Sequence, residues 1–119
     1  MNVSFGGIGE MAVTYLADDT VAAGYPVKMS GNGTVTVCGT GERFCGIAVG
    51  KSDDGYATVQ MKGFITMPYS GTNRPTPGYK NLVANGSGGV KVDAAATPTG
   101  GEFLIVEFDE TALTVGFYM

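Results

Sequence analysis

The sequence predicts an all-β fold: a small single-domain β-barrel or sandwich with two pseudo-repeated halves and a flexible N-terminal arm. Three observations support this prediction. Val, Thr, Phe, Tyr and Ile, which are enriched in strands, make up about a third of the 119 residues. The 20 Gly and 5 Pro gather between apolar runs, where they indicate turns. Short segments alternate apolar and polar residues, and a chain of this length is expected to form one modest core.

Ten strands are expected along the chain, each bounded by turn-forming residues. Tight hairpin turns are indicated where Asn or Asp precedes Gly, because these residues tolerate positive φ. They occur at Asn32-Gly33, Asp54-Gly55 and Asn85-Gly86. The expected strands are Met11–Ala17, Pro26–Met29, Thr34–Cys38, Phe44–Val49, Tyr56–Lys62, Phe64–Met67, Tyr79–Ala84, Val90–Val92, Phe103–Phe108 and Leu113–Met119.

The alternation is clearest in the middle of the chain. Alternate residues from Ala57 to Met61 are expected to face inward, and the residues between them, including Gln60, to face outward. Gly63 predicts a bulge or bend, after which the same ribbon continues. The segment 103–106 is apolar on both faces, so a central strand is predicted there.

An internal repeat is indicated by two similar segments. Residues 31–37, which contain Val35, recur as residues 86–92, which contain Val90. Residues 43–47 are similarly echoed by residues 102–105, so each half reads as hairpin, strand, acidic turn and strand. Chance similarity between strands that follow Asn-Gly turns is the alternative explanation. The predicted organisation is an arm over 1–10 and one barrel domain over 11–119, with pseudo-repeats at about 24–67 and 78–119.

The composition argues against several classes of protein. Without His there is no imidazole base or ligand, and two Cys cannot form a four-ligand zinc site. A net charge of −4 has the wrong sign for binding nucleic acid. No run approaches the ~18 to 20 apolar residues of a membrane helix, and the start lacks the regions of a signal peptide. The sequence therefore predicts no nucleic-acid or membrane partner.

Few residues are left that could carry chemistry. The acidic pairs 18–19, 53–54 and 109–110 fall at expected turns, where Asp commonly bonds its own backbone, so neither catalysis nor a calcium site is predicted. Cys38 and Cys45 flank a short connection and could form a disulfide or be two buried small residues. We therefore expect no catalytic, metal-binding or cofactor-binding residue, and a protein that is not an enzyme.

Two segments are candidates for contact with a partner. Only 15% of residues are charged, which suggests that some outer surface is covered by another subunit. The arm 1–10 carries apolar residues among glycines, and the segment 69–78 is the longest without strand character. The predicted interface residues are Val3, Phe5, Ile8, Tyr69 and Arg74.

Over about residues 12–119 the chain resembles the capsid cement, or head decoration, proteins of tailed bacteriophages and prophages. The residues that carry the resemblance are Ala23–Met29, Gly31–Gly33, Arg43–Val49, Val59–Phe64, Gly88–Lys91 and Asp109–Phe117. The resemblance implies a small β-barrel that binds the outer surface of the expanded head and stabilises it against the pressure of packaged DNA. The resemblance also implies that the partner is the major capsid protein and that the chain itself often forms a homotrimer. It further implies a location on the virion after synthesis in the bacterial cytoplasm.

Two other functions are compatible with the residues. A carbohydrate-binding or adhesive β-module would stack sugar rings on exposed aromatic residues, and Tyr25, Tyr56, Tyr69 and Tyr79 could serve if they shared one flat face. A small hydrolase would need two carboxylates in one cleft, at least one of them shielded from water.

Overall fold

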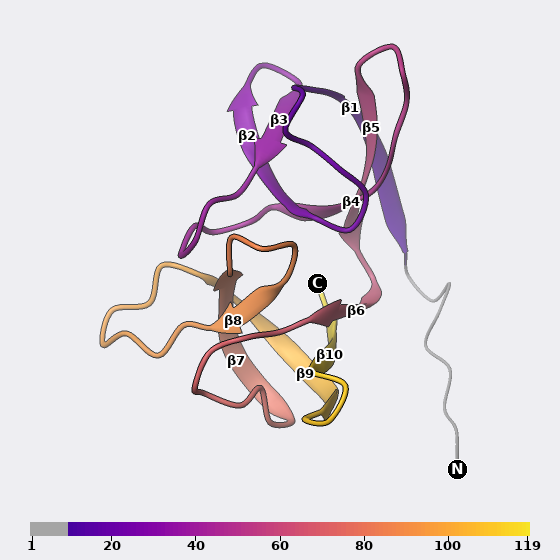
Figure 1. Ribbon diagram of the computed structural model, residues 1–119. Coiled ribbons are helices and arrows are strands. Elements are labelled where there is room, and N and C mark those ends of the chain that lie inside the picture. Colours follow the sequence, from indigo (N-terminus) through magenta and orange to yellow (C-terminus); the bar gives the residue numbers. More distant parts are fainter. Residues whose placement is uncertain (1–9) are drawn as a thin grey trace.

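The computed structural model describes residues 10–119 and confirms the all-β fold (Figure 1). All ten expected strands are present, with ends that differ from the expected ones by at most two residues. The strands are β1 (Met11–Ala17), β2 (Pro26–Gly31), β3 (Thr34–Val37), β4 (Gly46–Lys51), β5 (Tyr56–Lys62), β6 (Phe64–Pro68), β7 (Gly78–Ala84), β8 (Val90–Val92), β9 (Gly101–Asp109) and β10 (Thr114–Tyr118).

The strands form two five-stranded units that follow one another along the chain. The first five close a barrel in the order β1-β3-β2-β4-β5, and the last five form a sheet in the order β6-β10-β9-β7-β8. Tyr69, directly after β6, makes a parallel bridge to Val90 in β8, which bends the second sheet toward closure. Figure 1 shows the two units as two lobes with the C-terminus between them.

The two units have the same topology. Replacing each strand of the barrel by the strand five places later reproduces the pairs of the second sheet, and every matched pair runs in the same sense. The barrel closes through the parallel pair β1–β3, and the Tyr69–Val90 bridge is the parallel contact at the matching place. In both units the fourth strand carries one extra valine, Val49 in β4 and Val106 in β9, where its register with the fifth strand shifts.

The strand pairing changes one part of the predicted repeat. Gly46 pairs with Val27, and Gly101 pairs with Leu82 in the matching place, so these two glycines are equivalent. Phe44 and Phe103, which the sequence comparison had matched, are not equivalent. Their rings instead stack on one another, with centroids 5.2 Å apart. The sequence match was several residues out of register because both halves contain similar short motifs.

The chain passes from one unit to the other at Gly63. The predicted bend is confirmed, since Gly63 has a φ of 107° between β5 and β6. The same ribbon does not continue, because β6 pairs with β10 of the second sheet. Gln60 is 8% exposed rather than facing solvent, and its amide Nε2 donates to the carbonyl oxygens of Lys62 at 3.2 Å and Phe64 at 3.1 Å. Gln60 thus stabilises the backbone at the point where the chain passes from one unit to the other.

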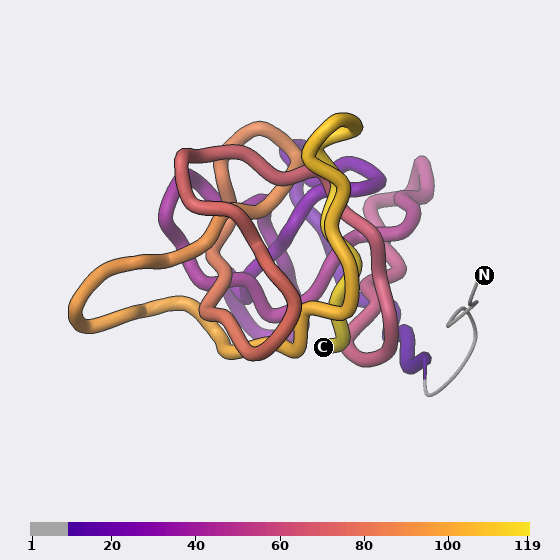
Figure 2. The backbone as a smooth tube through the Cα atoms, turned by 90° about the horizontal axis from the view of Figure 1, so that it is seen from below, coloured from indigo at the N-terminus to yellow at the C-terminus, as the bar shows by residue number. Residues whose placement is uncertain are grey.

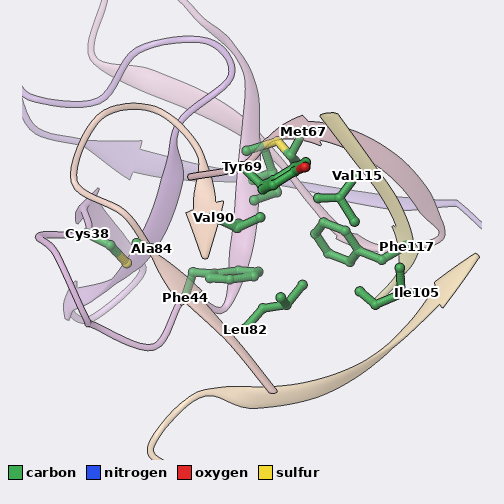
Figure 3. Packing of buried hydrophobic residues seen from close by; sticks show 11 residues of the cluster. Cys38, Phe44, Met67, Tyr69, Leu82, Ala84, Val90, Ile105, Val115 and Phe117 are labelled. Atoms are coloured by element: carbon green, nitrogen blue, oxygen red, sulfur yellow. The ribbon is translucent and has the colours of Figure 1, made fainter. Parts of the chain in front are cut away.

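The buried hydrophobic residues form two clusters, where a single core was expected. The smaller cluster fills the first barrel and contains Val21, Val27, Val35, Ala48, Ala57 and Val59. The larger cluster lies in the second unit but includes three residues of the first half, Cys38, Phe44 and Ile47 (Figure 3). Each sheet curls around its own interior, which divides the core, and these three side chains join the two units.

Candidate interaction surfaces

The structure separates the predicted interface residues. Val3, Phe5 and Ile8 lie outside the described residues. Tyr69 is only 6% exposed, and its ring packs edge-on against Phe108 with the centroids 6.5 Å apart. It is therefore a core residue, contrary to the expected surface contact.

Arg74 does lie on the surface. Its side chain is 67% exposed, and its Nε is 3.1 Å from Glu110 Oε2, in the turn between β9 and β10. Pro75 beside it is fully buried and holds the loop against the body of the protein. The segment 69–77 is thus an anchored loop that presents Arg74 to solvent, paired with a carboxylate.

Several acidic residues hold turns and loops. Asp18 accepts a hydrogen bond from the Thr20 amide at 3.0 Å, and Asp109 accepts from the amides of residues 111 and 112 at 2.9 and 3.1 Å. The Thr20 hydroxyl bonded to Asp18 holds the pKa of that carboxyl below its usual range. These contacts confirm the predicted use of Asp18 and Asp109 in turns.

A loop that projects far from the body of the protein is also held by a carboxylate. Residues 93–100 connect β8 to β9 and extend well beyond the rest of the chain (Figure 2). At the base of this loop, Asp93 accepts hydrogen bonds from the amides of Ala95, Thr99 and Gly100, at 3.3, 2.9 and 3.0 Å. The Gly100 amide, followed by that of Thr99, lowers the pKa of Asp93. This loop was not among the predicted contact segments, although the run Ala94–Gly100 contains no strand-forming alternation.

One hollow on the second sheet brings carboxylates together. It has a volume of about 480 Å³ and is lined by Thr66, Glu107, Phe108, Asp109, Glu110, Thr114 and Gly116. All three of its carboxylates are exposed, so none is shielded from water as a hydrolase pair would require. Within residues 10–119, no three His, Cys, Asp or Glu side chains gather closely enough to hold a metal ion.

Both cysteines are free thiols, and Cys38 is buried. Cys38 Sγ donates to the carbonyl oxygen of Arg43 at 3.6 Å. Burial raises the pKa of the Cys38 thiol from 9.0 to about 11, and burial also raises that of Cys45. The sequence allowed either a disulfide between Cys38 and Cys45 or two small residues with free thiols. The structure shows the second arrangement.

The raised pKa of Cys38 gives a stability that depends on pH. Between pH 9 and about 11 the thiol ionises in the unfolded chain but not in the folded one, so its contribution is present below this range and lost through it. We expect the stability advantage of the wild type over Cys38→Ala to shrink by about 1–2 kcal/mol across this range. Urea unfolding at a series of pH values measures the difference, in which the groups common to both proteins cancel. Parallel curves for the two proteins would contradict the prediction.

The four tyrosines considered for sugar binding do not share one face. Tyr69 is buried, while Tyr56 and Tyr79 lie on strands of different units. Tyr25 lies close to Gly88, where an added Cβ would be 3.2 Å from its ring. The flat aromatic face expected of a carbohydrate-binding module is therefore not formed by these residues.

The exposed apolar side chains are the surface feature that the sequence analysis did not locate. In the first barrel, Leu16 and Tyr56 are opposite each other on β1 and β5, and are 46% and 45% exposed. In the second sheet, Tyr79 and Leu104 are opposite each other on β7 and β9, and are 68% and 36% exposed. The signal in the sequence was the segment 103–106, apolar on both faces. As predicted, β9 is a central strand, yet Leu104 on its outer face is open to solvent.

A further hollow lies where the two units meet. It has a volume of about 460 Å³ and is lined by Arg43, Phe44, Cys45, Met61, Gly101, Glu102, Phe103 and Met119. These residues belong to both units and to the end of the chain.

The sequence matches no known family model and no curated protein. In the described part of the chain, no helix has the length and apolar character needed to cross a membrane.

Proposed function

We propose that the chain is a structural decoration protein that binds the outer surface of the expanded head of a tailed bacteriophage and stabilises it. The observation that carries the proposal is how the side chains are used. Carboxylates that could do chemistry hold turns and loops, as at Asp18, Asp93 and Asp109. Large apolar side chains remain exposed in both units, such as Leu16 in the first and Leu113 in the second. A surface of this kind favours association over catalysis.

The two-unit fold suits such a role. A binding protein that recognises only the assembled shell stabilises the shell by its own binding free energy, and many copies multiply the effect. This function requires a stable surface and no reactive group. The major capsid protein is the proposed partner, with self-association into a homotrimer. The resemblance over residues 12–119 adds support, because it covers strands of both units.

Co-sedimentation with phage heads tests the proposal. We expect the purified protein to sediment with expanded, emptied heads of the phage that encodes it and to ignore unexpanded shells. Light scattering is expected to give the mass of a trimer. A monomer at every concentration, together with no sedimentation with either kind of head, would contradict the proposal.

The contribution of the arm is tested in the same assay. Deletion of residues 1–10 is expected to leave the β-structure folded, as judged by circular dichroism, and to lower head affinity at least tenfold. The matched control keeps the length and composition of residues 1–10 but scrambles their order. Unchanged affinity after the deletion would remove the arm from the proposed contact with the head.

A further inference from the structure

An apolar row crosses the outer face of the second sheet. The strand register places Tyr79 opposite Leu104, Leu104 opposite Tyr118, and Tyr118 opposite Phe64. Four neighbouring strands, β7, β9, β10 and β6, thus contribute one large apolar side chain each. We call these four residues the apolar row. Cross-strand neighbours of this kind form one continuous surface.

The row lies on the open side of the sheet. Tyr79 is 68% and Leu104 is 36% exposed, while the core of this unit lies on the opposite side, with Ile105 and Phe117. The rings of Phe64 and Tyr118 meet edge to face, with centroids 5.5 Å apart. Gly116 lies beneath the Phe64 ring, since an added Cβ there would be 2.6 Å from that ring. The apolar row is therefore a strip of neighbouring side chains on the outer face of the second sheet.

The described part of the chain begins at the Phe64 end of this row. Glu10 passes directly beside Gly63, because an added Cβ at Gly63 would be 2.9 Å from the Glu10 Cα. Gly63 immediately precedes Phe64 at the start of β6. Glu10, which residues 1–9 precede, therefore lies next to one end of the apolar row.

The length and composition of residues 1–9 fit the row. The row spans three strand spacings, about 14 Å, and nine extended residues reach up to about 30 Å. The segment contains no charged side chain and carries Val3, Phe5 and Ile8. In an extended chain Val3 and Phe5 point to the same side. Its glycines at positions 6 and 7 allow the backbone to approach a surface closely.

We propose that residues 1–9 of the same chain lie across the apolar row and cover it, with Phe5 as the main contact. The covered row accounts for the sequence of β9, whose segment 103–106 is apolar on both faces. One face packs into the core, and the other packs under residues 1–9. In the free protein, the proposal gives the predicted contact residues Val3, Phe5 and Ile8 an intramolecular partner, and it does not depend on the proposed function.

A single tryptophan tests the proposal, because the chain contains none. In full-length Phe5→Trp, we expect tryptophan emission at shorter wavelength than in denaturant and several-fold weaker quenching by acrylamide. Adding Tyr79→Ser and Leu104→Ser should shift the emission back toward that of the unfolded chain. Circular dichroism checks that this variant remains folded, which is expected because both side chains are exposed.

The first barrel offers a matched control. Leu16 and Tyr56 form a cross-strand pair of the same residue types with similar exposure. Leu16→Ser with Tyr56→Ser should leave the emission of Phe5→Trp unchanged. An emission like that of the unfolded chain, or one that the Tyr79 and Leu104 substitutions do not change, would overturn the proposal. A short-wavelength emission lost on hundredfold dilution would also overturn it, because the segment would then cover a second copy. None of these measurements requires phage heads, so failure here is distinct from failure of the proposed function.

Discussion

Replacement of Phe44 by Ala is expected to lower the free energy of unfolding by about 3–5 kcal/mol. Phe44 is 3% exposed and belongs to the connection between β3 and β4 of the first unit, yet it packs in the core of the second. Its ring stacks on Phe103 at an interplanar angle of 11° and lies 6.4 Å from Phe117, between centroids. Alanine would leave a cavity at the place where the two units are joined.

Denaturant unfolding monitored by circular dichroism measures this loss. Phe44→Leu keeps an apolar side chain in the same place and is expected to cost less than about 2 kcal/mol. Tyr56→Ala removes a similar ring from a half-exposed site and should cost less than about 1 kcal/mol. If Phe44→Ala cost no more than Tyr56→Ala, the aromatic contact would not join the two units.

Replacement of Gly63 by Ala is expected to cost at least about 3 kcal/mol, for two separate reasons. A φ of 107° is strained for any residue with a Cβ. The added Cβ would also lie 2.9 Å from the Cα and Cγ of Glu10 and 3.2 Å from the Nε2 of Gln60. The substitution therefore disturbs both the backbone and the packing at the crossing between the units.

Gly78→Ala separates these two reasons. Gly78 has a φ of 118°, and an added Cβ there meets nothing within 4 Å. We expect it to cost about 1–2 kcal/mol, from backbone strain alone. The difference between the two variants, measured by urea unfolding, reports the contact with Glu10. Equal losses would show that Glu10 shifts freely away from Gly63.

The strands could be predicted from sequence because their signals are local. Alternation over Tyr56–Lys62 and the glycine turns at 33, 55 and 86 mark the strands and hairpins that the structure contains. Strand partners depend on contacts between distant residues. Nothing near Gly63 in the sequence indicates that β6 leaves the sheet of β5. Gln60 was therefore assigned to solvent, although the second unit covers that part of the first barrel, where its cross-strand neighbour Ile47 is buried.

The surface was less predictable than the strands, as the tyrosines illustrate. Tyr69 lies in a segment of polar and glycine residues, which is typical of an exposed loop, yet its bridge to Val90 draws it into the core. Tyr79 lies at the start of a strand, and only the register with Leu104 shows that it belongs to a row across the sheet. Residue type alone made the two tyrosines equally good candidates for the surface. Long-range strand pairing decided which of them is exposed.

The division at Gly63 also bears on how the protein is made. All strands of the first barrel come from residues 11–62, so they leave the ribosome before β6–β10 and can pair with one another at once. Until the later strands follow, Phe44 and Ile47 have no core to enter. During synthesis the nascent first half therefore exposes a hydrophobic patch. The C-terminal half of the same chain is the nearest partner that can bury it.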